Sequence, residues 1–478
     1  MAFRNLLAAA SALALAACAV GPDYVAAPPP PPAAAGPFLS ATGPAFGTGE
    51  AVAGDWWRLY DDPVLDRLVA DALAANTDIR VAVARLARAR ASLREVRGDR
   101  EPQLGVGASG QYGRPGVQGG AGGGKEGLQL GVGLDVAYEV YLFGRVGRNI
   151  EAARGDVAAA AADADSVRVA IAAETARAYA DAASAARQIA VARRIVALLD
   201  QSAQVTERRH QVGLGTGLDT ARIAALRNQR QAEVPLFEAQ RQSALFRLAT
   251  LTGRAPRDLP ADAGVRAVPL RLDRPIPVGD GAALLARRPD VRAAERRLAA
   301  ATARIGVATA DLYPRITLGG SIGAAGTGLG NLFGGNPLSW LLGPLINWTA
   351  NRTAARARVA GAEADAQAAL ATFDGTILTA LEESETALSN YARSLERRTA
   401  LQAASDEAEK ATRITRARQR EGQIDSLELL DAERTSADAS AALALADARI
   451  AQAQVDVFRA LGGGWQAAPP VAAAAPAR

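Results

Sequence analysis

The chain is poor in the residues on which most enzyme and metal sites depend. It contains one cysteine, one histidine and one methionine among 478 residues, and aromatic residues make up only 5%. With Cys18 alone, no disulfide can form within the chain, and His210 has no nearby histidine or cysteine with which to bind a metal. A nucleophile–base pair is also lacking. The sequence therefore predicts a protein that is not an enzyme and uses no cofactor other than a covalent lipid, discussed below.

Long apolar segments are missing as well. After the N-terminus, no stretch has the roughly 18 uncharged apolar residues that a transmembrane helix needs. If the chain crosses a membrane, it must therefore use strands. The formal net charge of +4 is small for this length, and acidic and basic residues are interspersed, so we expect no nucleic-acid partner.

The first residues have the pattern of a bacterial export signal. Arg4 precedes an apolar run from Leu6 to Ala17, and Leu15-Ala16-Ala17-Cys18 resembles the cleavage site of bacterial lipoproteins. We therefore expect removal of residues 1–17 and lipidation of the Cys18 sulfur. The alternative is that Cys18 is a small buried apolar residue. In bacterial lipoproteins, a residue other than Asp after the cysteine, here Ala19, is typical of sorting to the outer membrane.

Two segments near the ends of the mature chain have compositions that do not favour packing. The stretch from Gly21 to about Gly49 is rich in Pro and Ala, and we expect an extended tether that contributes nothing to a core. The residues after Trp465 are similar, and we expect a disordered tail.

The second half of the chain repeats the first at an offset of about 210 residues. Asp78-Ile79-Arg80 returns as Asp290-Val291-Arg292, and Pro102-Gln103-Leu104 returns as Pro314-Arg315-Ile316. Further on, Gly213 with Leu218-Asp219 returns as Gly422 with Leu427-Glu428. This period is too long for a solenoid, whose units have about 20–50 residues. We interpret it as two copies of one large supersecondary unit.

Each copy contains two segments in which apolar and polar residues alternate. From Leu128 to Leu142 the even positions are apolar, whereas the odd positions include Gln129, Asp135 and Glu139. Residues 104–112 alternate in the same way, and in the second copy Ile316, Leu318 and Ile322 alternate with polar residues. The fourth segment is less regular: Trp340, Leu342, Ile346 and Trp348 share a face, but Pro344 lies within it, and Leu341 and Leu345 face the other way.

These predicted strands fit either a soluble sheet with one wet face or strands that cross an outer membrane. Tyrosine and tryptophan near the strand ends, such as Tyr112 and Trp340, favour the membrane, where aromatic side chains occupy the interfaces. Four strands leave two open edges, which hydrocarbon does not tolerate. If the strands cross the membrane, other copies of the chain must therefore close the barrel.

Long helices are predicted between the strand pairs. No proline interrupts Arg148–Val212 or Thr353–Glu421, and some 60 residues make a helix of roughly 90–100 Å. A glycine-containing break and a returning helix follow each one, at Asp219–Leu251 and Ser426–Leu461, and Pro235 should kink the first return.

The two turns at the ends of these hairpins have the residues that helix ends require. Gly213 and Gly422 suit left-handed helix ends. Thr216 or Asp219 in the first turn, and Asp425 in the second, suit caps of the returning helices. Capping alone would explain these turns.

Several well-separated motifs together resemble the TolC-like outer-membrane efflux proteins, specifically the lipidated branch (NodT/OprM-like) that serves resistance-nodulation-division (RND) pumps. The motifs are Cys18-Ala19-Val20-Gly21-Pro22-Asp23-Tyr24, Leu59-Tyr60-Asp61-Asp62-Pro63, Leu142-Phe143-Gly144-Arg145, Arg287-Arg288-Pro289-Asp290-Val291-Arg292, Leu312-Tyr313-Pro314-Arg315-Ile316 and Leu430-Asp431-Ala432-Glu433-Arg434. They run from residue 18 to near the end of the last predicted helix.

The resemblance implies a mixed α/β membrane protein that assembles as a homotrimer, with a 12-stranded transmembrane β-barrel and a periplasmic α-helical barrel. It implies a periplasmic adaptor and an inner-membrane RND-type pump as partners, besides outer-membrane lipid. Val212-Gly213-Leu214 matches the first adaptor-docking tip of the family, whereas at the second tip Gly422 is kept and Gln423 is not typical. Asp425 lies where the family has an acidic gate, although its capping role is an equal alternative.

The predicted organisation follows the two copies. It comprises a signal peptide (1–17), a lipidated tether (18–50), a helical arm (51–101), a barrel hairpin (102–147), a long helical hairpin (148–270), a second helical arm (271–313), a second barrel hairpin (314–350), a second long helical hairpin (351–464) and the tail (465–478).

The function that these features favour is a passive exit duct of a tripartite efflux system, which conducts small toxic molecules through the outer membrane. One alternative is a duct for type I protein secretion, against which the lipoprotein signal and the Cys18–Tyr24 motif argue. Another is a periplasmic coiled-coil scaffold or adaptor lipoprotein, which would have no membrane-spanning strands.

Overall fold

The computed structural model describes residues 20–25, 32–47, 54–113, 126–327, 338–349 and 351–463. The chain folds as two compact units, each built from three segments. Unit 1 combines residues 1–28, 85–161 and 293–374, and unit 2 combines residues 29–84, 162–292 and 375–478. The predicted signal peptide, Cys18 and the tail from residue 465 lie outside the described residues.

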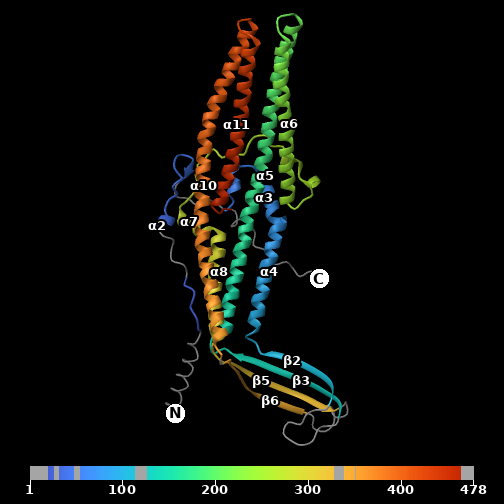
Figure 1. Cartoon of the computed structure of the whole chain (residues 1–478), viewed down its shortest axis with the longest axis vertical. Helices are drawn as coiled ribbons and strands as arrows, with labels where there is room; N and C mark the ends of the chain where they lie inside the picture. Colours follow the sequence, from blue (N-terminus) through green and yellow to red (C-terminus); the bar gives the residue numbers. More distant parts are fainter. Residues whose placement is uncertain are drawn as a thin grey trace. The chain divides into compact units, whose positions relative to one another are not determined.

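Unit 1 contains an antiparallel sheet of four strands in the order β2-β3-β5-β6 (Figure 1). The strands are β2 (Gln103–Gly113), β3 (Gly127–Val140), β5 (Arg315–Thr327) and β6 (Leu338–Asn347). The register pairs Val106 with Leu134, Leu134 with Ile322, and Ile322 with Trp340. Because paired residues share a face of a sheet, the alternating apolar residues of all four strands line one face, with Leu341 and Leu345 of β6 as exceptions. The four predicted strands are confirmed.

The irregular fourth strand also forms as the sequence indicated. Pro344 pairs with Leu318 within β6, which is an edge strand of this sheet, where proline is tolerated. Leu341 pairs with Ser321 and Leu345 with Thr317, so both leucines lie on the face opposite Trp340.

The two helices that adjoin β3 and β5 in the chain pack closely against each other. The helix α5 (Arg145–Gln211) follows β3, and α8 (Pro289–Ala310) precedes β5. A Cβ added at Gly155 in α5 would lie 2.8 Å from the Cβ of Ala300 in α8, so the two helices approach closely only because position 155 has no side chain. At the junction of β3 and α5, the guanidinium of Arg145 pairs with the carboxylate of Glu139 at 2.5 Å.

The predicted helical hairpins are confirmed. In the first, α5 has 67 residues and is followed by α6 (Gly217–Leu251) with 35. In the second, α10 (Thr353–Arg420) has 68 residues and is followed by α11 (Ser426–Ala460) with 35. Helix α6 is not interrupted at Pro235, while the predicted kink stays a prediction. Across the part of the chain that the structure describes, no helix combines the length and apolarity needed to span a bilayer.

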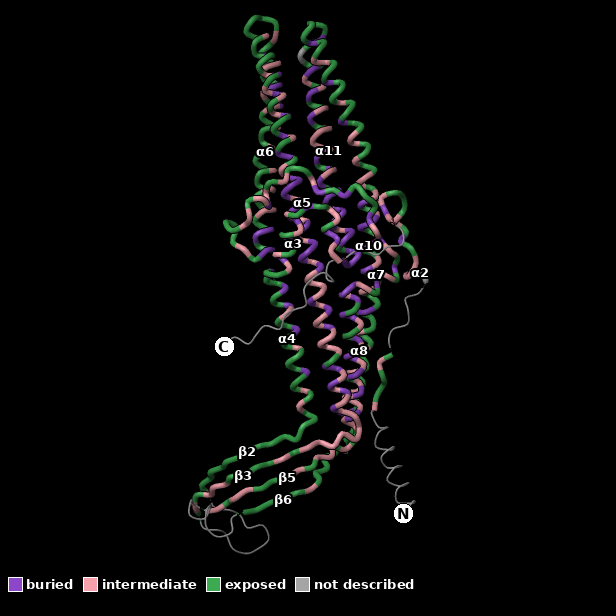
Figure 2. The backbone as a smooth tube through the Cα atoms, turned by 180° about the vertical axis from the view of Figure 1, so that it is seen from behind, coloured by how far each residue is buried: buried purple, intermediate pink, exposed green. Residues whose placement is uncertain are grey.

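Alanine allows the helices of unit 2 to pack closely. Ala172, Ala176 and Ala180 of α5 are fully buried and four residues apart, so they lie on one side of the helix. Buried residues recur along α5 and α11, whereas the far ends of the hairpins are exposed (Figure 2).

The main core of unit 2 is built around aromatic and aliphatic side chains near the start of α3 (Pro63–Ala75). The Trp56 ring stacks on Phe458 of α11, with ring centroids 4.6 Å apart. Asp62 caps α3 by accepting hydrogen bonds from the backbone N–H groups of Val64 and Leu65. Its second oxygen accepts from the Tyr179 hydroxyl at 2.9 Å. This buried carboxylate therefore joins the start of α3 to α5.

The prediction that the Pro/Ala-rich segment contributes nothing to a core is wrong for residues 32–47. Phe38 and Phe46 are buried in the unit 2 core, and Phe46 contacts the Tyr391 ring edge to face at 5.9 Å. The backbone N–H groups of Leu39 and Ser40 donate to the two carboxylate oxygens of Glu385 at 2.7 and 2.8 Å. Composition pointed to a tether because the partners of these residues lie about 345 positions away in the sequence.

Both ends of the segment 32–47 also make tertiary contacts. The short helix α2 (Pro32–Ala35) is followed by β1 (Phe46–Gly47), which pairs in parallel with β4 (Ile276–Pro277). A Cβ added at Gly281, the first residue of α7 (Gly281–Arg287), would lie 2.1 Å from the Ala34 carbonyl oxygen. The N-terminal segment therefore lies directly against the backbone of α7.

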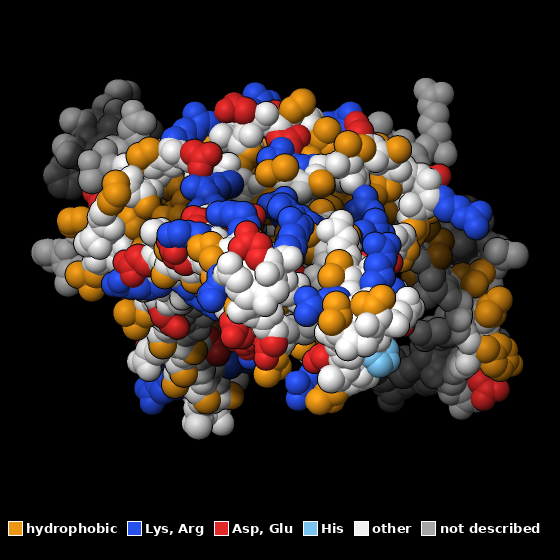
Figure 3. Space-filling view, turned by 90° about the horizontal axis from the view of Figure 1, so that it is seen from above, with side chains coloured by type: hydrophobic (Ala, Val, Ile, Leu, Met, Phe, Trp, Pro, Cys, Tyr) orange, Lys and Arg blue, Asp and Glu red, His pale blue; other side chains and the backbone are white. Residues whose placement is uncertain are grey.

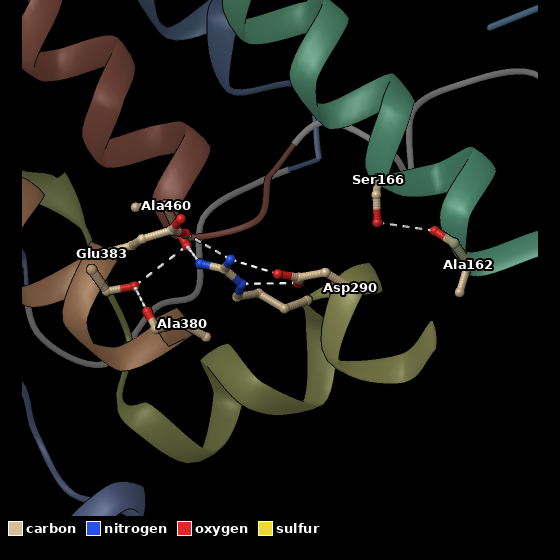
Figure 4. A network of polar contacts seen from close by, with 8 residues as sticks. Ala162, Ser166, Asp290, Ala380, Glu383 and Ala460 are labelled. Carbon is tan, nitrogen blue, oxygen red and sulfur yellow. Dashed lines mark hydrogen bonds and ion pairs between the residues drawn. The ribbon is translucent and has the colours of Figure 1, made fainter. Parts of the chain in front are cut away.

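A buried arginine joins three helices in unit 2. The Arg288 side chain is 9% exposed and donates from Nε and Nη2 to the two oxygens of Asp290, at 3.0 and 2.6 Å. It also donates to the Ala460 carbonyl at 3.0 Å and to Glu383 at 2.8 Å. Asp290, Glu383 and Ala460 come from α8, α10 and α11, and they converge on one point (Figure 4).

Candidate functional site: the tips of the helical hairpins

The first tip, at the turn between α5 and α6, is shaped by a glycine in the left-handed conformation. Gly213 has a φ of 78°, as predicted for a helix end. Its N–H donates to the His210 carbonyl at 3.0 Å, and the Leu214 N–H donates to the Arg209 carbonyl at 2.8 Å. These bonds satisfy carbonyls that the end of α5 would otherwise leave without partners.

The second tip, between α10 and α11, ends in the same way. Gly422 has a φ of 73°, its N–H donates to the Gln419 carbonyl at 3.0 Å, and the Gln423 N–H donates to the Arg418 carbonyl at 3.0 Å. The predicted left-handed glycines at both tips are therefore confirmed.

The side chains that the two tips expose differ in chemistry. At the first tip, the side chains of Val212 and Leu214 are apolar and well exposed, at 70% and 69%. At the second tip, Glu421 and Gln423 are exposed and hydrogen-bonded to each other at 2.8 Å. The first tip thus offers apolar contact area and the second offers polar groups. Viewed toward the hairpin ends, Lys and Arg side chains gather among apolar ones (Figure 3).

Each returning helix begins with a side-chain cap. Thr216 and Asp219 form a reciprocal capping box at the start of α6, in which the Asp219 carboxylate accepts from the Thr216 N–H at 3.0 Å and hydroxyl at 2.8 Å. These hydrogen bonds, the one from the hydroxyl first, hold the pKa of Asp219 below its usual value. The predicted caps of α6 are confirmed.

Asp425 caps α11 and also borders a cavity. Its Oδ1 accepts from the backbone N–H groups of Leu427 and Glu428, both at 2.9 Å. An open cavity of about 450 Å³ lies between the tips, and its lining includes Asp425, Leu427, Gly213, Leu214 and Arg222. The structure therefore brings the predicted gate residue together with the first predicted docking tip. Within the described ranges, no group of three or more His, Cys, Asp or Glu side chains is placed to bind a metal.

Below the tips, a buried carboxylate connects the two hairpins. Glu433 of α11, whose side chain is 4% exposed, accepts from Arg416 of α10 at 2.9 Å. The same oxygen accepts a short hydrogen bond from the Ser202 hydroxyl of α5. Because α5 belongs to the first hairpin, Glu433 links both hairpins within one chain.

This link could not be predicted from the sequence. Glu433 lies in the quoted Leu430–Arg434 motif, which could have drawn attention to it, but no spacing indicated its pairing with Ser202, 231 residues away. A further ion pair, between Arg230 of α6 and Asp438 of α11, joins the same two hairpins.

A second candidate site, in unit 1, holds the residues that follow the predicted lipidation site. Arg148 of α5 donates to the Asp23 carboxylate at 2.5 Å and to the Gly21 carbonyl at 3.3 Å. Gly21 has a φ of 93°, and a Cβ there would lie 2.4 Å from the Cα of Gly306 in α8. Only glycine fits this position, because other residues are strained at this φ and their Cβ atom would collide with Gly306.

The flanking residues extend this contact in both directions. The Val20 N–H donates to the carbonyl of Phe143 at 3.5 Å, next to the end of β3. The Tyr24 hydroxyl donates to Glu295 of α8 at 3.1 Å. Residues 20–24 therefore form a docked segment, a role that sequence analysis did not assign to them.

Residues 68–254 and 282–463 match the family model described as outer membrane efflux protein. The outer membrane protein OprJ of Pseudomonas aeruginosa is 34% identical, in an alignment that covers 95% of this chain and 94% of OprJ. The antibiotic efflux pump outer membrane protein ArpC of Pseudomonas putida is 30% identical and covers 96% of this chain and 95% of ArpC.

Solved structures resemble the whole fold. The structure of the outer-membrane channel OprN superposes with a TM-score of 0.87 at 38% identity, covering 94% of this chain and 100% of OprN. The similarity thus includes the strands and both hairpins.

Proposed function

The chain belongs to the outer membrane efflux protein family, and on that premise we propose how its residues build and operate an efflux channel. The protein is an outer-membrane efflux channel with a periplasmic extension, and it is not an enzyme.

We propose that three chains close one 12-stranded transmembrane β-barrel, and that the two halves of each chain are structural repeats. The observation that supports closure is the four-stranded sheet, in which β2 and β6 are edges and one face is apolar from edge to edge. In this assembly the apolar face contacts lipid, the other face lines the pore, and β6 of one chain pairs with β2 of the next.

The helical hairpins of the three chains form a periplasmic α-helical barrel in this proposal. In this proposal a partner in the periplasm meets the two glycine-ended tips first. The partners are a periplasmic adaptor and, through it, an inner-membrane RND-type pump, and the cargo consists of small toxic molecules.

The observation that carries adaptor docking is the exposed Val212–Leu214 turn. Gly213 holds the turn in a conformation that a β-branched residue adopts only with strain, and this places two apolar side chains on the surface. Gly422 and Gln423 form the second, more polar contact. Exposed apolar side chains on rigid turns are suited to insertion between the helices of a partner.

Asp425 is proposed as part of the closed gate. Its carboxylate is exposed and borders the cavity between the tips while it caps α11. Both capping hydrogen bonds end on the Oδ1 atom of Asp425. The other carboxylate oxygen takes no part in the cap, so the same side chain can cap α11 and contribute to a gate.

Cys18 is proposed as the lipidation site. The docked segment supports this proposal, because Val20 is tied to Phe143 beside the end of β3. Cys18 precedes Val20 by only two residues in the sequence, so a lipid on its sulfur would be tethered close to the base of the sheet.

Replacement of Gly213 by valine tests the docking proposal. Valine at a φ near 78° costs roughly 1–2 kcal/mol and should reshape the turn. We expect drug efflux in cells to fall several-fold, and crosslinking to the adaptor to fall with it, while the amount of channel in the outer membrane is unchanged.

Gly217→Val provides the matched control at the same tip. Gly217 has no positive φ, and nothing lies within 3.9 Å of a Cβ added there, so this variant should support normal efflux. Unchanged efflux and crosslinking in Gly213→Val would contradict the docking proposal.

A further inference from the structure

The face of the sheet opposite the apolar one has several rows made only of glycine and other small residues. One row of register partners across β3, β5 and β6 consists of Ala137, Gly319 and Gly343. Another consists of Gly133, Gly323 and Ser339. A larger side chain between these rows is therefore bordered mainly by backbone.

Two rows on this face combine a carboxylate, a hydroxyl and a leucine. In the first, Asp135 pairs with Ser321, which pairs with Leu341. In the second, Glu139 pairs with Thr317, which pairs with Leu345. Neighbouring strands lie about 4.8 Å apart, so the carboxylate and the leucine of one row are separated by about 10 Å.

The two carboxylates differ in charge compensation. Glu139 accepts two hydrogen bonds from the Arg145 guanidinium, at 3.0 and 2.5 Å, so its charge is balanced. Asp135 is exposed and makes no ion pair with any described residue. The first row thus presents an uncompensated negative charge.

The leucines have no core to pack into on this face. Leu341 and Leu345 are 70% and 63% exposed. Leu345 leans over the backbone of β5, since a Cβ added at Gly319 would lie 3.0 Å from its Cδ1 atom. Apolar side chains are unusual on the water-facing side of membrane strands, where polar residues are the rule.

We propose that Asp135, Ser321, Leu341 and Leu345 form a transient binding site for lipophilic organic cations on the inner wall of the barrel. This inference rests on the proposed function, in which this face lines the pore. The Asp135 carboxylate attracts the cationic group and the two leucines cover the apolar body of the same molecule. The surrounding glycines leave room for a bulky cargo, and weak binding on the exit path is compatible with conduction.

Single-channel recording of the full-length protein in planar bilayers tests the site. The probes are tetraphenylphosphonium, a lipophilic cation, and tetramethylammonium, which has the same charge without the large apolar body. We expect tetraphenylphosphonium to reduce the open-channel current at concentrations at least tenfold lower than tetramethylammonium. Asp135→Asn and Leu341→Ala should each weaken this block several-fold while unitary conductance is retained.

Leu342→Ala is the matched control, because Leu342 is the next residue of β6 and lies on the opposite face. Tetraphenylphosphonium should block the Leu342→Ala channel at the same concentrations as it blocks the unchanged protein. Equal block by the two probes, or block that neither Asp135→Asn nor Leu341→Ala alters, overturns the site while leaving the channel intact. An unchanged protein that does not conduct overturns the proposed function itself, and this inference with it.

Discussion

At the scale of single residues, Arg288 shows how one side chain holds several helices together. Its planar guanidinium donates in three directions, to Asp290, to Glu383 and to the Ala460 carbonyl. Lysine carries the same charge but lacks the fixed fork that binds both oxygens of Asp290. Geometry as well as charge therefore favours arginine here.

Arg288→Ala should lower the thermal midpoint of the detergent-solubilised protein. The substitution removes one of the two donors of the Ala460 carbonyl and a donor of two carboxylates, a loss of roughly 2 kcal/mol. Arg288→Lys should give an intermediate value. Arg58→Ala is the control, since its ion pair with Asp55 is largely exposed and should contribute little. Equal midpoints for Arg288→Ala and Arg58→Ala would contradict the role of this network.

At the scale of elements, the caps of the returning helices fix where each tip ends. The capping box of Thr216 and Asp219 binds the first N–H groups of α6, which have no partners within the helix. The tip conformation therefore depends on the local helix start as well as on Gly213.

Thr216→Ala should loosen the first turn of α6 by about 1 kcal/mol at neutral pH. Hydrogen exchange of the amides at residues 218–221 measures this effect, and Thr216→Ser should behave as the unchanged protein. Exchange in α11 is the internal control. If these amides are protected from exchange equally in Thr216→Ala and in the unchanged protein, the capping box does not determine where α6 begins.

The Asp219 carboxylate also makes the first turn of α6 sensitive to acid. Because the folded pKa of Asp219 is lowered, its contribution is fully present above the ordinary pKa of about 3.9 and is lost as pH falls through the lower folded value. Asp219→Asn should therefore increase exchange at pH 7, and the difference from the unchanged protein should shrink below about pH 4. Solvent screening keeps the effect small, because the carboxylate is exposed. A difference that grows on acidification would contradict this assignment.

Much of the element structure could be predicted from the sequence, because local rules determine it. Strict alternation around Leu134 and Asp135 places opposite chemistry on the two faces of β3 whatever the strand packs against. Long proline-free segments favour helix, and Gly213 and Gly422 have few alternatives as helix ends.

The contacts that could not be predicted join residues far apart in the chain. Glu433 meets Ser202, and Glu385 binds the backbone of Leu39, through packing that no local spacing encodes. The same reason explains why residues 32–47 were expected to form a tether. Phe46, in a Pro/Ala-rich stretch, becomes a core residue only when α10 supplies Tyr391 as its partner.

At the scale of the whole molecule, the two faces of the sheet determine how the chain meets the membrane. Ile322 belongs to the apolar face, and the preceding Ser321 belongs to the opposite face. If the apolar face contacts lipid, a charge is costly at one position and tolerated at its neighbour.

Ile322→Arg should reduce the amount of protein recovered from the outer membrane, because a lipid-facing arginine near the bilayer midplane costs about 2–4 kcal/mol. Ser321→Arg should assemble normally, since its guanidinium would lie in the water-filled pore. The amount of each variant in detergent extracts of outer membranes measures both effects. The reverse ranking of the two variants would mean that the faces are assigned the wrong way round.

The claim that four strands per chain complete one pore is tested most directly by a joint measurement on purified full-length protein. The mass of the detergent-solubilised particle is determined, and the same preparation is reconstituted in planar bilayers for conductance. The account predicts a particle of three chains that forms conducting channels. A monomeric particle that does not conduct would contradict it.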